Sequence, residues 1–140
     1  MVDVVRFRVA QTSDFDVLVQ FNRAMAKETE GIDLDIDTLK AGVSNVLRCH
    51  GNGSYYVAEL QGEVVAALMI TYEWSDWRNC QLWWIQSVYV HPDHRRKGFF
   101  RQLYKYVRQA AEQAQAGGLR LYADTTNEKA HATVRMLCHH

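Results

Sequence analysis

The sequence predicts a single α/β domain, in which helices cover both faces of a mixed central β-sheet. Three observations support this prediction. The chain has 140 residues and one proline, a length that suits one domain spanning residues 1–140. Alternating or continuous apolar runs predict strands, and apolar residues three or four apart predict helices. The two kinds of segment follow in the order strand, helix, helix, three strands, helix, strand, helix.

The first part of the chain carries one strand and two helices. Apolar and polar residues alternate over residues 4–9, which predicts a strand. Apolar residues at helical spacing then predict a helix over 12–27. The acidic segment 28–37 interrupts the pattern, and a second helix is expected over 39–47, before the glycines at 51 and 53.

The rest of the chain predicts a meander followed by helix, strand and helix. Residues 54–60 and 63–74 form a hairpin around Gln61 and Gly62, and the apolar run 81–90 reads as a central strand that stops before Pro92. Three further elements complete the sheet and its covering: a helix over 98–114, a strand over 119–124 and a helix over 127–137.

Charge and hydropathy restrict the class of partner. Sixteen basic and sixteen acidic residues give a formal net charge of zero, which does not suit a nucleic-acid or membrane binder. The sequence has no apolar run long enough for a transmembrane helix and no signal-peptide pattern at its start. We therefore expect a cytoplasmic protein whose charged chemistry is local.

Such a local charge lies where the apolar strand 81–90 gives way to the next helix. Arg95, Arg96 and Lys97 precede Gly98, at the predicted start of this helix. A helix N-terminus exposes unpaired N–H groups, and glycine lets an anion approach the backbone closely. The pattern indicates a site for a phosphate-bearing small molecule, and a solvated helix start with surface arginines is the alternative. The glycine spacing excludes a P-loop and a dinucleotide-binding turn.

The same segment resembles a known family. The sequence Arg-Arg-Lys-Gly-Phe-Phe at 95–100 matches the pattern [QR]xxGx[GA], except that Phe100 takes the last small position. The residues 127–130, Asn-Glu-Lys-Ala, are similar to the NxxA at the start of that family's last helix. With the order of elements, these motifs resemble the GNAT superfamily of N-acetyltransferases, and small-amine or polyamine-type members in particular.

This resemblance implies a site for acetyl-coenzyme A as cosubstrate. Backbone groups of residues 88–90 would pair with the pantetheine arm like an added strand, and backbone amides of 96–101 would hold the pyrophosphate. The N–H near Val88 would polarise the acetyl carbonyl, and an amine would attack directly, without an acyl-enzyme. The cofactor-binding candidates are Val88, Tyr89, Val90, Arg95, Arg96, Lys97, Gly98, Phe99, Phe100, Arg101 and Asn127.

Several positions depart from the family pattern. Gln86 and Ser87 stand where polyamine-type enzymes have acidic residues, and Val134 stands where they have a tyrosine. The general base therefore stays open between Glu28, Glu73 and a chain of waters. A coenzyme A-binding or assembly module without catalytic activity is the alternative function.

The chain also lacks the strands that follow the last helix in the family. This absence predicts an unpaired edge along the strand 119–124, so that either the chain is truncated or a partner copy covers the edge. We therefore expect a homodimer with residues 119–140 at or near the interface.

The acceptor candidates lie in two other segments. The acidic stretch 28–37 would attract a small or peptide amine, and Glu28 and Glu30 are its best candidates because Asp35 and Asp37 suit helix caps. Trp74 and Trp77 could form a wall of the acceptor pocket. No metal site is expected, because the acidic stretch lacks the glycine and the final glutamate of a calcium loop.

Overall fold

The computed structural model describes the backbone of residues 4–125 and 128–134, and the side chains of residues 4–121. Six strands form one sheet in chain order, β1-β2-β3-β4-β5-β6. Neighbouring strands are antiparallel, except that β4 and β5 are parallel. The mixed sheet that the sequence predicts is therefore confirmed. The strands are β1 (Val5–Val9), β2 (Ser54–Leu60), β3 (Glu63–Ser75), β4 (Cys80–Val90), β5 (Gly118–Thr125) and β6 (Glu128–Val134).

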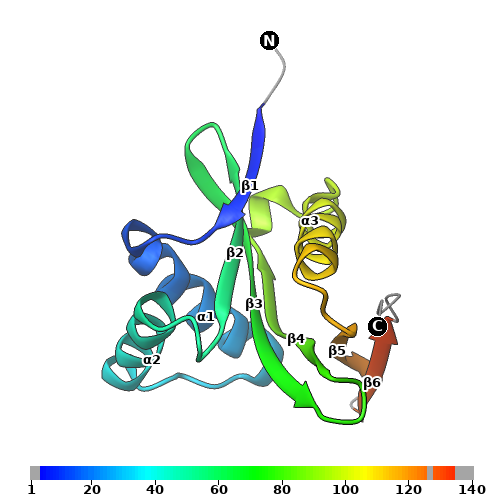
Figure 1. Ribbon diagram of the computed structural model, residues 1–140. Helices are drawn as coiled ribbons and strands as arrows, with labels where there is room; N and C mark the ends of the chain where they lie inside the picture. The colour runs from blue at the N-terminus through cyan, green and yellow to red at the C-terminus, as the bar shows by residue number, and fades with distance from the viewer. Residues whose placement is uncertain (1–3, 126–127, 135–140) are drawn as a thin grey trace.

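Three helices cover the sheet, as Figure 1 shows. The helices α1 (Phe15–Glu30) and α2 (Ile36–Arg48) lie against one face, and α3 (Phe99–Gln113) lies against the other. The α2 helix begins where the Asp35 carboxylate accepts a hydrogen bond from Thr38 N at 2.9 Å, which confirms the expected cap. The α1 helix ends at Gly31, whose φ of 66° is the left-handed conformation that glycine adopts without strain. Helices on both faces are therefore confirmed.

The core divides into two apolar clusters, one on each face of the sheet. Leu18 and Val43 anchor the cluster beneath α1 and α2, and both are almost completely buried. Leu103 and Val107 of α3 anchor the other cluster, in which they pack with Leu68 and further side chains of β3 and β4. Apolar burial on both faces explains why the β3 and β4 sequences read as nearly continuous apolar runs.

The last element differs from the sequence prediction. A helix was expected over 127–137, whereas residues 128–134 form β6, antiparallel to β5 with Leu121 opposite Ala132. The sequence Lys-Ala-His-Ala-Thr-Val alternates polar and apolar residues, a period that suits a strand. The expectation of an unpaired edge along β5 is therefore wrong, because β6 of the same chain pairs with it.

The β4 strand carries a β-bulge in its second half. Ile85 lies opposite Ile70, but the next residue of β3, Met69, lies opposite Ser87, so that Gln86 is an extra residue in β4. A bulge bends the strand and increases its local twist, and such irregularities are common next to active sites. Here it lies where β4 and β5 stop pairing.

Candidate active site

The candidate site begins where β4 separates from β5. The two strands pair only from Leu82 opposite Gly118 to Ile85 opposite Leu121. The β4 strand continues to Val90 and is paired there with β3. Among the residues that the structure describes, no strand pairs with the other side of β4 beyond Ile85. The second half of β4 therefore has one unpaired edge in the described part of the chain.

The hydrogen bonds to β3 establish which backbone groups face the open side. His91 donates its N–H to Val65 O at 2.8 Å. Residues of an antiparallel pair alternate between those that exchange hydrogen bonds and those that do not. Val88 and Val90 therefore direct their N–H and C=O groups away from β3, towards the open side.

The N-terminus of α3 follows one short loop later. Gly98 precedes the helix with a φ of 84°, and no side chain caps the helix. A Cβ at this glycine would have its nearest neighbour 3.9 Å away, at the Gln102 amide nitrogen, so the space above the backbone is open. The first N–H groups of a helix have no partner within it, and they carry the positive end of its dipole. The turn therefore offers an anion an unobstructed approach.

A single open groove joins these two features. Its volume is about 630 Å³, within the usual range for small-molecule sites. Its wall comes from α1, β4, β5 and the start of α3: Met25, Glu28, Thr29, Val88, Tyr89, Val90, Arg95, Phe100 and Leu121. Five of these residues, Val88, Tyr89, Val90, Arg95 and Phe100, are among the cofactor-binding candidates, and Glu28 is an acceptor candidate.

Glu28 and Arg95 meet at this groove although they are far apart in the chain. Arg95 Nη2 donates to Glu28 Oε2 at 2.9 Å and to Oε1 at 3.2 Å, and Arg95 Nε donates to Val90 O at 2.9 Å. The guanidinium also lies 5.2 Å from the centre of the Tyr89 ring. Burial raises the pKa of the Tyr89 phenol, and the Glu28 carboxylate raises it further.

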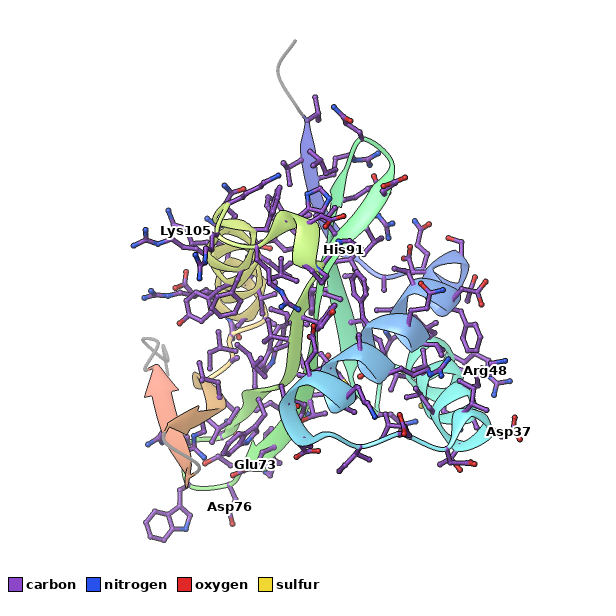
Figure 2. The ribbon with its side chains drawn as sticks, turned by 180° about the vertical axis from the view of Figure 1, so that it is seen from behind. Asp37, Arg48, Glu73, Asp76, His91 and Lys105 are labelled. Carbon is purple, nitrogen blue, oxygen red and sulfur yellow. The ribbon has the colours of Figure 1, made fainter. Side chains whose placement is uncertain are left out.

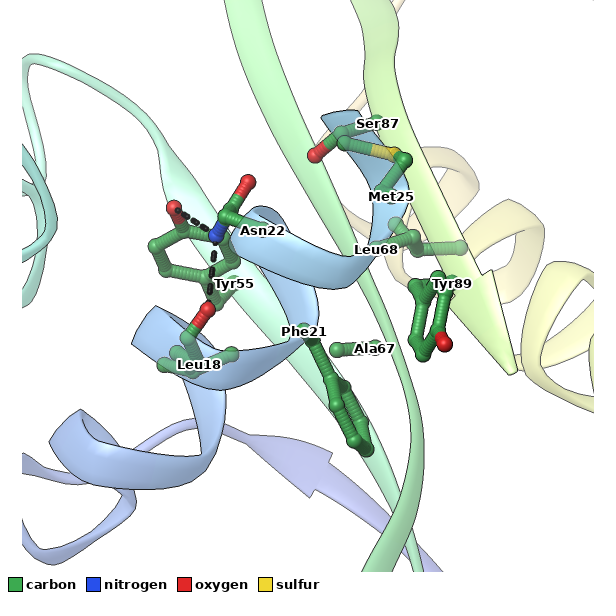
Figure 3. A pocket seen from close by; sticks show the side chains of 9 residues that line it. All are labelled: Leu18, Phe21, Asn22, Met25, Tyr55, Ala67, Leu68, Ser87 and Tyr89. Carbon is green, nitrogen blue, oxygen red and sulfur yellow. Dashed lines mark hydrogen bonds between the residues drawn. The ribbon is translucent and has the colours of Figure 1, made fainter. Parts of the chain in front are cut away.

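A second, much smaller pocket lies beneath α1, and Figure 3 shows its lining. Asn22 donates from its amide to Leu18 O at 2.8 Å and to the Tyr55 hydroxyl at 3.3 Å. Ser87 and Tyr89 of β4 line the opposite side. The pocket measures only about 10 Å³, which is too small for a cosubstrate.

Other predicted residues lie away from the groove. Glu73 is opposite Leu82, six residues before Val88, which places it about 20 Å away along the strand. Its carboxylate accepts a hydrogen bond from Trp84 Nε1 at 2.8 Å and lies 3.7 Å from Arg120 Nη1. Trp74 and Trp77 are exposed and lie still nearer the β3–β4 turn. In Figure 2, Asp76 of this turn and His91 lie at opposite ends of the hairpin.

Most of the remaining site candidates lie at the start of α3. Arg96, Lys97 and Arg101 are exposed there, whereas the Phe99 side chain is buried in the core. Glu30 is exposed at the last residue of α1. Asn127 lies outside the described residues.

Sequence reasoning missed three residues of the groove wall, Leu121 of β5 and two residues of α1. Met25 and Thr29 line the groove together with Glu28. They are four residues apart on α1, so they share one face of the helix. Met25 also lies three residues before Glu28, so helical spacing from Glu28 would have identified Met25, and Met25 would then have identified Thr29.

A protein-family model matches most of this chain. The model, described as the acetyltransferase (GNAT) family, matches residues 18–137. The chain belongs to the GNAT family. Its members transfer an acyl group from acetyl-CoA to an acceptor, so the protein is an acetyltransferase by family.

Solved structures agree with this GNAT assignment. A possible acetyltransferase from Clostridium difficile 630 is 43% identical, with 89% of this chain and 82% of that chain covered and a TM-score of 0.83. A ribosomal-protein-alanine N-acetyltransferase from Brucella melitensis biovar Abortus 2308 shares the fold at 17% identity, with 88% and 82% covered and a TM-score of 0.73. An aminoglycoside acetyltransferase from an uncultured soil metagenomic sample, in complex with sisomicin, shares it at 17% identity, with 89% and 80% covered and a TM-score of 0.71. A comparison with curated proteins finds no match.

No group of three or more metal-ligating side chains occurs among the residues described. Over the same residues, no helix is long and apolar enough to cross a membrane.

Proposed function

We propose that this protein transfers the acetyl group of acetyl-CoA to an amine, and that the groove between α1, β4 and α3 binds the cosubstrate. The observation that carries this proposal is the continuity of two features in one groove. The open side of β4 suits an extended amide-bearing arm, and the uncapped start of α3 suits a pyrophosphate. In this proposal, backbone groups of Val88 and Val90 pair with the pantetheine arm, and N–H groups of residues 96–101 hold the phosphates.

The reaction centre is proposed to lie at Val88. Bound acetyl-CoA supplies a thioester carbonyl, whose oxygen gains negative charge when an amine attacks. The Val88 N–H points to the open side of β4, where it can donate a hydrogen bond to that oxygen. A fixed backbone donor of this kind stabilises developing charge without reorganisation during the reaction.

We propose direct attack by the amine, because no suitable thiol lies at this place among the residues that the structure describes. Cys80 is buried at the start of β4, eight residues before Val88, and Cys49 is exposed at the end of α2. Ser87 is adjacent to Val88, but no hydrogen bond joins it to a histidine or a carboxylate among the described residues. The arrangement therefore supports a ternary complex rather than an acyl-enzyme.

The acceptor is proposed to be a cationic amine that approaches from the α1 side, near Glu28 and Glu30. Because Glu73, Trp74 and Trp77 lie far along the hairpin, we leave them out of the reaction centre. With Glu73 removed from the choice, Glu28 or a chain of waters stays as the proposed base. The polyamine-type acceptor and the cytoplasmic location stay predictions.

A glycine substitution tests the proposed cosubstrate site. We expect Gly98→Glu to abolish coenzyme A binding in calorimetry, because it adds bulk and negative charge where the phosphates would approach. Gly62→Glu is the matched control: Gly62 has the same φ of 84° and also has open space around it, but lies in the turn between β2 and β3. Unchanged affinity in Gly98→Glu would refute the site.

Turnover separates the proposed function from its alternative. A transferase releases coenzyme A in the presence of an amine, and the amide product accumulates at the same rate. We propose a screen of small and peptide amines with acetyl-CoA, followed by thiol release. Tight coenzyme A binding without product from any amine would favour a binding or assembly module.

A further inference from the structure

The Arg95 side chain contacts three residues of the groove wall. Its Nε donates to Val90 O of β4, its Nη2 donates to both carboxylate oxygens of Glu28 on α1, and its guanidinium lies against the Tyr89 ring. Glu28, Val90 and Arg95 all line the groove. The arginine therefore links the α1 side of the groove to the β4 side.

These contacts conflict with two requirements of cosubstrate binding. Val90 O lies on the open side of β4, where the pantetheine arm is proposed to pair, and Arg95 Nε already donates to it. The Glu28 carboxylate also offsets the positive charge of Arg95, three residues before the glycine turn that is proposed to receive the phosphates. Both effects oppose the binding of an anionic molecule with an amide-bearing arm.

We propose that Glu28 and Arg95 form a clasp across the groove, which is closed in the free protein and opens when the cosubstrate binds. The inference rests on the proposed function, and it makes Glu28 a residue that regulates cosubstrate binding. On opening, Arg95 leaves Val90 O and its charge becomes available to the phosphates. Glu28, released from the arginine, then faces the groove.

The exposure of the pair sets the size of the expected effect. The Glu28 and Arg95 side chains are 43% and 44% exposed, so the ion pair is a weak one. A ligand that binds only the open form has its affinity reduced by the fraction of protein that is open. For a weak pair, the clasp should lower the apparent affinity for coenzyme A by about two- to six-fold.

Calorimetry with coenzyme A tests the clasp. Glu28→Gln removes the charge but keeps the shape, and should bind coenzyme A about two- to six-fold more tightly than the unaltered protein. Glu28→Ala also removes the hydrogen bonds and should lie at the upper end of this range. Glu63→Gln is the matched control, because it removes one exposed carboxylate at the β2–β3 turn, and its affinity should not change.

The outcomes separate the clasp from the function on which it rests. Equal or weaker binding by Glu28→Gln, with normal binding by the unaltered protein, would overturn the clasp alone. Absence of binding by all variants and by the unaltered protein would overturn the proposed function, and the clasp with it.

A spectroscopic measurement reports on Arg95 directly. The Nε–H signal of Arg95, assigned from its loss in Arg95→Lys, should exchange slowly with solvent in the free protein because it is bonded to Val90 O. Saturating coenzyme A should shift this signal and speed its exchange. An unchanged signal in the complex would overturn the opening of the clasp.

Discussion

Asp14 is a buried carboxylate that binds the Arg8 side chain of β1 and the backbone N–H of Gln11. It is 6% exposed, and its oxygens accept hydrogen bonds from Arg8 Nη1 at 2.7 Å, from Arg8 Nη2 at 3.0 Å and from Gln11 N at 2.7 Å. Arg8 also contacts Glu59 of β2 at 3.1 Å. Burial acts to raise the pKa of Asp14, but the hydrogen bonds from Arg8 and Gln11 outweigh it and hold this pKa below its usual value.

We expect Asp14→Asn to lower the free energy of unfolding by about 1.5–3 kcal/mol, because hydrogen bonds to a charged group are lost. The stability that Asp14 contributes should depend on pH. A carboxyl with a lowered folded pKa stabilises fully above its unfolded pKa, about 3.9, and loses this effect as the pH falls through the folded value. Urea unfolding of both proteins from pH 7 down to pH 2 would measure the difference.

The control for this prediction is Asp76→Asn in the exposed β3–β4 turn. It should change the unfolding free energy by less than about 0.5 kcal/mol at every pH, as surface substitutions usually do. A gap between the two variants that did not narrow in acid would contradict the assigned role of Asp14.

Gln86 is the extra residue of the β4 bulge, and its amide donates to Thr71 Oγ1 at 2.7 Å. A glutamine cannot act as a general base, so we expect Gln86→Ala to reduce turnover far less than the ~100-fold typical of a lost base. The rate of thiol release, with the best amine from the screen, measures this. Gln81→Ala, on the same strand but near its start, is the matched control. A loss of 100-fold or more in Gln86→Ala alone would contradict this interpretation of the strand.

At the scale of elements, the sequence predicted the order as far as β5, and it failed at β6. The earlier elements have long periodic patterns, or apolar runs bounded by Gly and Pro, which local physics specifies well. Residues 129–134 alternate polar and apolar residues over only six positions, and the resemblance to a helix-starting motif at Asn127 favoured the wrong element. The partner that selects a strand is β5, a contact between elements that local periodicity does not reveal.

For the candidate site too, local sequence patterns could be read, but contacts between distant residues could not. The glycine turn before α3 was predictable, because its signal lies within a few neighbouring residues. The contact of Glu28 with Arg95 was not, because it joins positions 67 residues apart. The sequence also did not reveal that β4 and β5 stop pairing after Ile85, because the strand sequence continues to Val90 without interruption.

The pairing of β5 predicts a pattern of amide exchange. Residues 119–121 have β4 on one side and β6 on the other, so all their amides should exchange slowly. Residues 122–125 pair with β6 alone, so only alternate amides should be protected there. Hydrogen exchange followed by NMR would measure this pattern. The β1 strand, which pairs only with β2, is the internal control for alternating protection. Rapid exchange throughout 122–125 and 128–134 would contradict the pairing.

At the scale of the whole molecule, the described sheet has two edge strands, β1 and β6. The expected homodimer was argued from an open edge at β5, and that premise is wrong. The unpaired outer edge now belongs to β6, a strand that can pair with a second copy of itself. A two-fold dimer through β6 stays our prediction, since closed two-fold pairs are the commonest soluble assemblies.

Light scattering at micromolar concentration should therefore give twice the chain mass of 16.2 kDa. In such a dimer, both sides of β6 are paired, so consecutive amides over 128–134 should exchange slowly. A monomer mass, with only alternate amides of β6 protected, would contradict the dimer.

The extra residue Gln86 changes which residues of β4 point towards α3, the odd-numbered or the even-numbered ones. Before it, the odd-numbered Trp83 and Ile85 belong to the cluster on the α3 face, and after it the even-numbered Val88 and Val90 do. Deleting Gln86 would restore a uniform count and would leave Ser87 opposite Met69 and Val88 opposite Leu68, because the extra residue has no partner of its own. Val88 and Val90 would therefore keep their backbone groups on the open side, and β4 would lose only the bend and the added twist of the bulge. A gap of a single residue at this place in an alignment thus marks chains that have the same edge on a straighter β4.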